Sequence, residues 1–129
     1  MRALVATEGG TFEVDLEEEL VLGPADAEIE PDEPDVVLPR LVAAAASGST
    51  VVAVLDRRPP LAVSHDAGAT WTESGRGLPP GRAVTIHPDD PDTVLYAGRN
   101  RLFLSRDGGR FWRGLAPELP AIARVAFAS

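Results

Sequence analysis

Two eight-residue segments of this chain follow one template and recur 41 positions apart, at residues 64–71 and 105–112. Both read Ser-x-Asp-x-Gly-x-(Thr or Phe)-Trp. A repeat of about 40 residues is typical of stacked four-stranded β-units, because one such sheet leaves apolar surface that only a neighbouring unit covers. The two octets therefore predict an all-β architecture built from repeated sheets.

Strand signals around the octets come in sets of four, separated by turn-forming residues. In the last complete set, β-branched or apolar runs lie at residues 83–86, 93–97, 102–105 and 111–115. The preceding set matches it, with runs at residues 40–46, 50–55, 61–64 and 70–73. The alanine-rich run at 41–46 also has helical propensity, but the period and the neighbouring strands favour a strand.

The two ends of the chain predict a further unit that is divided between them. Residues 3–7, 11–14 and 19–22 resemble the last three strands of a degenerate repeat, and residues 122–128 resemble a first strand without its sheet. The 129 residues thus form one domain of about three units. The predicted parts are a split first unit (1–22 plus 122–128), an acidic loop (23–39), a second unit (40–74) and a third (82–115).

The octets resemble the Asp boxes of the BNR-repeat family, found in sialidases, sortilin-type receptors and photosystem assembly factors. Residues 87–98 are similar to the stretch between boxes in such repeats. The resemblance implies a β-propeller with four-stranded antiparallel blades, in which one terminus completes the blade of the other. It also implies that the boxes are structural and lie away from the ligand face.

The residue types of the octets favour the same structural role. An aspartate can accept backbone N–H bonds within a turn, and a glycine can take a positive φ without steric cost. The serines can bond locally, and the tryptophans bring apolar area to the sheet after the turn. The expected structural residues are Ser64, Asp66, Gly68, Thr70, Trp71, Ser105, Asp107, Gly109, Phe111 and Trp112.

No arrangement of residues in the sequence predicts a catalytic or metal site. Ser64, His65 and Asp66 have the letters of a catalytic triad, but adjacent residues point in different directions. Two histidines without ligand spacing make no zinc site, and Asp89, Asp90 and Asp92 lack a calcium-loop framework. Cysteine is absent. We therefore expect no catalytic residue, no metal and no cofactor.

A sialidase-like glycosidase is the alternative function, with a site formed across a dimer. The resemblance would require an arginine triad, a tyrosine nucleophile and an aspartate acid. The single tyrosine, Tyr96, lies on a predicted strand, and no arginine matches the triad by its surroundings.

Charge is distributed unevenly along the chain. Residues 1–39 hold one arginine and twelve acids, whereas residues 40–129 hold eleven arginines and eight acids. The overall charge of −8 argues against a nucleic-acid partner. The loops expected opposite the boxes carry Arg57, Arg58, Arg99, Asn100 and Arg101. They are candidates to bind an acidic ligand or protein partner, unless the acidic loop, expected on the same face, neutralises them.

The number of repeats predicts self-association. Propeller rings usually have four to eight blades, so three blades would leave two apolar faces exposed. We expect a homodimer that forms a six-bladed ring, in which residues 122–128 of each copy complete the first blade of the other. A closed three-bladed monomer and an arc completed by another protein are the alternatives. With no apolar run long enough to span a membrane and no signal-peptide pattern, we expect a cytoplasmic binding or scaffold protein without a membrane association.

Overall fold

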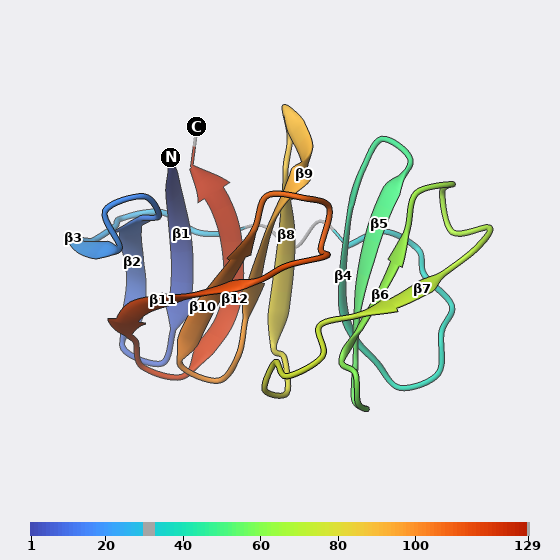
Figure 1. The fold of residues 1–129 in the computed structure, drawn as a ribbon. Helices are drawn as coiled ribbons and strands as arrows, with labels where there is room; N and C mark the ends of the chain where they lie inside the picture. Colours follow the sequence, from blue (N-terminus) through green and yellow to red (C-terminus); the bar gives the residue numbers. More distant parts are fainter. Residues whose placement is uncertain (30–32, 129) are drawn as a thin grey trace.

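The computed structural model describes residues 1–29 and 33–128 (Figure 1). Every regular element in this part of the chain is a β-strand, and the strands form three four-stranded antiparallel sheets, which confirms the predicted fold class. The strands are β1 (Arg2–Thr7), β2 (Gly10–Asp15), β3 (Leu20–Pro24), β4 (Leu41–Ser47), β5 (Thr50–Leu55), β6 (Leu61–Ser64), β7 (Thr72–Ser74), β8 (Ala83–His87), β9 (Asp90–Ala97), β10 (Arg101–Ser105), β11 (Arg113–Glu118) and β12 (Ile122–Ala128).

Sheet 1 is built from both ends of the chain, in the order β12-β1-β2-β3. Strand β12 runs antiparallel to β1 of the same chain, with Val125 opposite Val5 and Ala126 opposite Leu4. Sheet 2 contains β4 to β7 and sheet 3 contains β8 to β11, each in sequential order. A single chain does not test the exchange of β12 between two copies, which stays a prediction.

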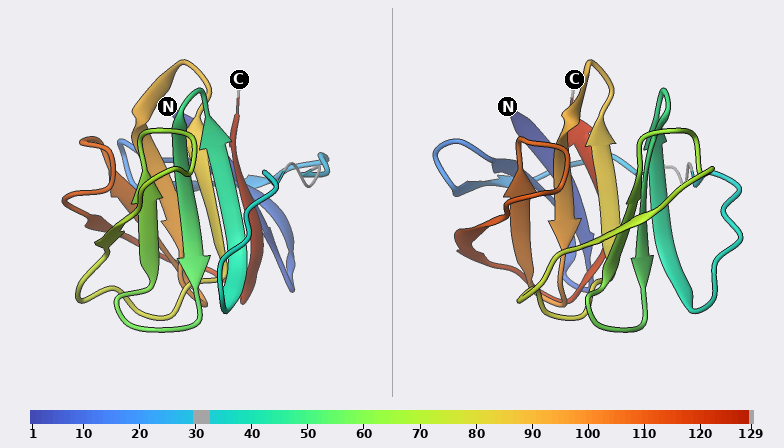
Figure 2. Two further views of the ribbon diagram at one scale, coloured as in Figure 1. Left: turned by 90° about the vertical axis from the view of Figure 1, so that its right-hand side faces the viewer. Right: turned by 45° about the vertical axis from the view of Figure 1, so that its right-hand side comes forward.

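Sheet 3 lies between the other two sheets, so the spatial order is sheet 2, sheet 3, sheet 1 (Figures 1 and 2). The first strands of the sheets lie side by side, since β8 contacts both β4 and β12. The sheets fan out from these inner strands to the outer strands β3, β7 and β11. The result is an arc that is open between sheets 1 and 2.

The side chains of β9 alternate between the two interfaces of sheet 3. Val94 and Tyr96 are buried against sheet 2, whereas Leu95 and Ala97 are buried against sheet 1. Successive strand residues point to opposite faces, so a strand that is covered on both sides reads as a continuous apolar run. This explains the continuous apolar run at residues 94–97.

The outer face of sheet 2 is covered by the connection between β3 and β4. Val36 and Leu38 of this connection, together with Leu41 and Trp71, pack on Ala53, Leu55 and Ala62. The outer face of sheet 1 is partly charged, because Arg2 and Glu13 form an ion pair there at 3.5 Å. The expectation of a bare apolar face is therefore wrong for sheet 2, whose outer face is covered from within the chain. For sheet 1 it stays a prediction, because Leu20, Val21 and Leu22 of β3 are exposed.

The same connection follows a different path from the expected one. Ile29 and Glu33 lie beside β4, β8 and β12, where they line a cavity of about 500 Å³, and Arg124 Nη1 donates to the carbonyl oxygen of Ile29 at 3.4 Å. Because sheet 3 separates sheets 1 and 2, the connection passes the inner strands instead of crossing the arginine-bearing loops (Figure 2). Within the predicted acidic loop, residues 30–32 lie outside the described residues.

Strands β7 and β11 begin later than the pattern predicts. The expected starts were residues 70 and 111, whereas the strands begin at Thr72 and Arg113. The backbone N–H groups of Thr70 and Phe111 are bonded to aspartates of the octet turns. Those residues therefore belong to the turns and cannot join the ladder.

Candidate functional site

The two octets form equivalent turns between the third and fourth strands of sheets 2 and 3. Ser64 Oγ donates to Asp66 Oδ1 at 2.7 Å, and Ser105 Oγ donates to Asp107 Oδ1 at 2.8 Å. The same aspartate oxygens accept the backbone N–H of Thr70 at 2.8 Å and of Phe111 at 3.0 Å. The two carboxylates are thus occupied by bonds within their own turns.

The protonation of these aspartates reflects the bonds. The hydroxyl and backbone N–H of Thr70, followed by the Ser64 hydroxyl, lower the pKa of Asp66 to about 2. The N–H of Phe111 is the main cause that lowers the pKa of Asp107 below its ordinary range. Gly68 and Gly109 have φ values of 90° and 91°, which L-residues with a side chain rarely adopt. Both octets thus form turns that are held by hydrogen bonds among their own residues.

The two tryptophans of the octets occupy corresponding places in successive sheets. Trp112 packs in the interface of sheets 2 and 3, with its ring centre 5.8 Å from that of Tyr96. Trp71 packs on the outer face of sheet 2, beside the covering residues Val36 and Leu38. Phe111 differs from both, because its side chain is 79% exposed.

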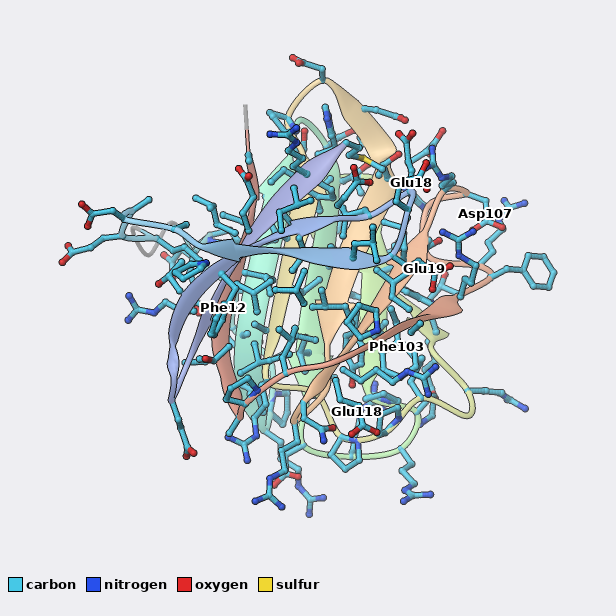
Figure 3. The ribbon with its side chains drawn as sticks, turned by 90° about the vertical axis from the view of Figure 1, so that its left-hand side faces the viewer. Phe12, Glu18, Glu19, Phe103, Asp107 and Glu118 are labelled. Atoms are coloured by element: carbon cyan, nitrogen blue, oxygen red, sulfur yellow. The ribbon has the colours of Figure 1, made fainter. Side chains whose placement is uncertain are left out.

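The arginine-bearing loops lie at the other end of the sheets from the octet turns. Figure 3 shows Asp107 near one end of sheet 3 and Glu118 near the other. Glu118 lies opposite Arg101 in the β10–β11 ladder, and Arg101 directly follows the β9–β10 loop. The β5–β6 and β7–β8 loops lie at this same end (Figure 1). We call this end of the molecule the rim.

The five residues that the sequence suggested as an anion site have different surroundings in the structure. Arg101 is engaged locally: its Nε donates to the Leu115 carbonyl at 2.8 Å, and its guanidinium lies 5.9 Å from the centre of the Phe103 ring. Arg57 forms an ion pair with Glu73 at 3.8 Å. Arg99 and Asn100 are exposed, and their carbonyls accept N–H bonds from the chain that leads into β12.

Arg58 lines a rim cavity of about 430 Å³, together with Pro59, Pro60, Arg76, Gly77, Leu78 and Pro79. Two exposed arginines and three prolines therefore line this cavity, and no carboxylate is among the lining residues. In the part of the chain that the structure describes, neither Arg58 nor Arg76 forms an ion pair. A guanidinium presents a planar fork of donors that matches a carboxylate or a phosphate.

Tyr96 holds the loop that forms one wall of this cavity. Its hydroxyl donates to the Pro79 carbonyl, and its burial raises the pKa of the phenol to about 12. Gly81 leaves the space that the ring fills, since a Cβ there would lie 2.6 Å from Cζ of Tyr96. The position of the β7–β8 loop therefore depends on the packed interior of sheet 3.

Sequence reasoning missed Arg76 as a partner of Arg58. The repeat itself could have indicated this position. In a propeller, the connection from one sheet to the next lies at the same end of the sheets as the loops between second and third strands. Arg76 stands in such a connection, at residues 75–82.

Among residues 1–29 and 33–128, no group of three or more histidine, aspartate or glutamate side chains is placed to hold a metal ion. The described residues also contain no helix of the length and hydropathy that crossing a membrane requires.

Comparison with known proteins places the fold and not the family. No family model matches the sequence, and no curated protein matches it. A solved structure of YCF48 bound to D1 peptide is similar over 94% of this chain and 38% of that one, with a TM-score of 0.53 and 14% identity. A second, the GH74 enzyme of Niastella koreensis, has a TM-score of 0.48 and 23% identity over 88% of this chain and 18% of that enzyme. The first similarity shows that the three sheets match part of a β-propeller structure, and that this chain spans well under half the length of that protein.

Proposed function

We propose that this protein is a non-catalytic binding module of the Asp-box (BNR) type, which holds an acidic ligand in the rim cavity between Arg58 and Arg76. The observation that carries the proposal is the presence of these two arginines in the lining of one cavity that no carboxylate lines. An anion in this cavity can accept hydrogen bonds from two guanidinium groups, and no carboxylate of the lining repels it.

Two other observations support a binding role. The aspartates of the octets are occupied by their own turns, at the opposite end of the sheets from the rim. The similar YCF48 structure is of a protein bound to a peptide, so a β-propeller scaffold of this kind serves recognition in that case. The glycosidase alternative has no comparable support, because paired carboxylates do not line the rim cavity.

The second part of the proposal concerns assembly, as a homodimer in which two copies exchange β12. The connection between β3 and β4 spans residues 25–40, whereas the connection from sheet 2 to sheet 3 takes only residues 75–82. The long connection supports the exchange, because it allows β1–β3 to pair with either copy of β12.

Fluorescence anisotropy with a labelled tetraglutamate peptide tests the rim cavity. Arg58→Gln and Arg76→Gln should each weaken binding at least about fivefold, since each removes one charge-assisted contact. Arg99→Gln is the matched control, because Arg99 is an exposed rim arginine outside the cavity. Competition with citrate and with inorganic phosphate then distinguishes a carboxylate site from a phosphate site. Equal effects of all three substitutions, or none, would refute the proposal.

A further inference from the structure

A groove of about 750 Å³ runs along the outer seam between sheets 2 and 3. Its lining includes four apolar side chains from the interior of the seam: Val63, Leu78, Phe103 and Trp112. One wall is β7 and the other is the octet turn of sheet 3, at residues 108–112. The Ser74 hydroxyl donates to the Gly109 carbonyl and ties the two walls together.

The groove adjoins the rim cavity. Arg76, Gly77 and Leu78 line both hollows, so one short segment of the β7–β8 loop is their common wall. A ligand anchored at Arg58 and Arg76 can therefore continue into the seam without crossing another element.

Strand β7 offers an open sheet edge along the groove. It is the last strand of sheet 2 and pairs only with β6, and no backbone partner lies on its other side among the described residues. The equivalent edge of sheet 3 is already used in part, since the Glu19 carboxylate accepts the N–H of Ala116 in β11 at 2.8 Å and Pro117 follows. An open edge above an apolar floor is the arrangement by which sheets bind extended peptides through main-chain bonds.

The charges of the groove select an acidic occupant. Arg76 and Arg110 both line it, and the one carboxylate in the lining, that of Glu73, is paired with Arg57 at 3.8 Å. The exposed side chain of Phe111 adds apolar surface to the groove. The lining thus combines two arginines with aromatic side chains.

We infer that the seam groove binds an extended acidic peptide, which adds a strand to β7 and places one large apolar side chain on Phe103 and Trp112. This inference rests on the proposed function, because the acidic end of the peptide occupies the rim cavity. It adds the chemical class of the ligand and a second set of contacts.

The test uses a labelled octapeptide that has two glutamates at one end and a single leucine four residues away. Replacing that leucine by serine should weaken binding about tenfold, and N-methylation of alternate backbone amides should weaken it similarly. Arg110→Gln and Phe111→Ala, both at exposed positions, should each weaken binding at least about threefold. Arg106→Gln is the matched control, because Arg106 is exposed in the same turn but does not line the groove.

The outcomes separate this inference from the proposed function. Binding that depends on Arg58 and Arg76, but is indifferent to the leucine, to N-methylation and to Arg110, would overturn the peptide groove and leave the rim site standing. Loss of binding in Arg110→Gln and in the N-methylated peptide, without any effect of Arg58→Gln, would support the groove and overturn the rim site, because Arg58 lines the rim cavity alone whereas Arg76 lines both. If substitutions in the rim cavity and in the groove both weaken binding, the rim site and the peptide groove are both supported.

Discussion

The hydroxyl of Tyr96 donates a hydrogen bond of 2.5 Å to the carbonyl oxygen of Pro79. Tyr96 is fully buried in sheet 3, whereas Pro79 forms a wall of the rim cavity. One bond therefore connects a fully buried side chain of the core to the loop that contains Arg76. It explains how a loop with two prolines and three glycines can hold a defined site.

Tyr96→Phe should lower the free energy of unfolding by about 1–2 kcal/mol, because it leaves a carbonyl without its donor while the ring still fills its space. It should also weaken tetraglutamate binding, since the β7–β8 loop loses an anchor. Thermal denaturation and anisotropy measure the two effects. Unchanged affinity in a destabilised variant would show that the loop keeps its position without this bond.

Leu38 and Val37 are adjacent, yet only one of them packs on sheet 2. Leu38 is half-buried over Ala53 and Ala62, whereas Val37 is 92% exposed. Leu38→Ser should lower the free energy of unfolding by about 1–2 kcal/mol through lost apolar burial, and Val37→Ser should change it by less than about 0.5 kcal/mol. Urea denaturation of the two variants provides the comparison. Equal midpoints would contradict the covering role of this segment.

The octet aspartates predict a loss of stability in acid. Their folded pKa values lie below the ordinary value of 3.8, and that of Asp66 is about 2, so the unfolded chain binds more protons in this range. The contribution is present above about pH 4 and is lost as the pH falls through about 2.

Denaturation of Asp66→Asn/Asp107→Asn between pH 7 and pH 2 measures this effect. The variant should be less stable than the wild type at pH 7 and should show a flatter decline in acid. Asp26→Asn/Asp35→Asn removes the same two charges from the exposed connection and controls for net charge. If the stability of the octet variant fell in acid as steeply as that of the wild type, the prediction would be contradicted.

The proposed exchange of β12 is open to a disulfide test, because the chain contains no cysteine. Leu4 and Ala126 are opposite each other in the β1–β12 ladder. Mixing the single variants Leu4→Cys and Ala126→Cys, with unfolding and refolding, should give a covalently linked pair after oxidation if the strand is exchanged. Light scattering of the wild type should then give twice 13.6 kDa. A mass of 13.6 kDa, with a linkage formed only inside the Leu4→Cys/Ala126→Cys double variant, would refute the exchange.

The candidate site was predictable only in part. Arg58 could be chosen because its loop follows a second strand of the repeat, and the repeat places such loops opposite the octets. Its neighbour Arg76 lies 18 positions away, and no local pattern states that the two residues share a cavity. Arg101 stands at an equivalent kind of position, yet its guanidinium is held by Leu115 and Phe103. Exposed charge in the sequence does not distinguish these cases.

The elements that the sequence alone determines are those stabilised over short distances. The octet turns follow from serine, aspartate and glycine bonding within a few residues, and the strands follow from alternating or continuous apolar runs. The order of the sheets (Figure 1), the path of Val36 and Leu38 and the presence of Arg58 and Arg76 in one cavity come from the tertiary structure. These contacts join segments that are far apart in the chain, so they depend on which apolar faces pack together during folding. The repeat in the sequence specifies the strands of each sheet, whereas the packing of the three sheets determines which of them lie next to each other.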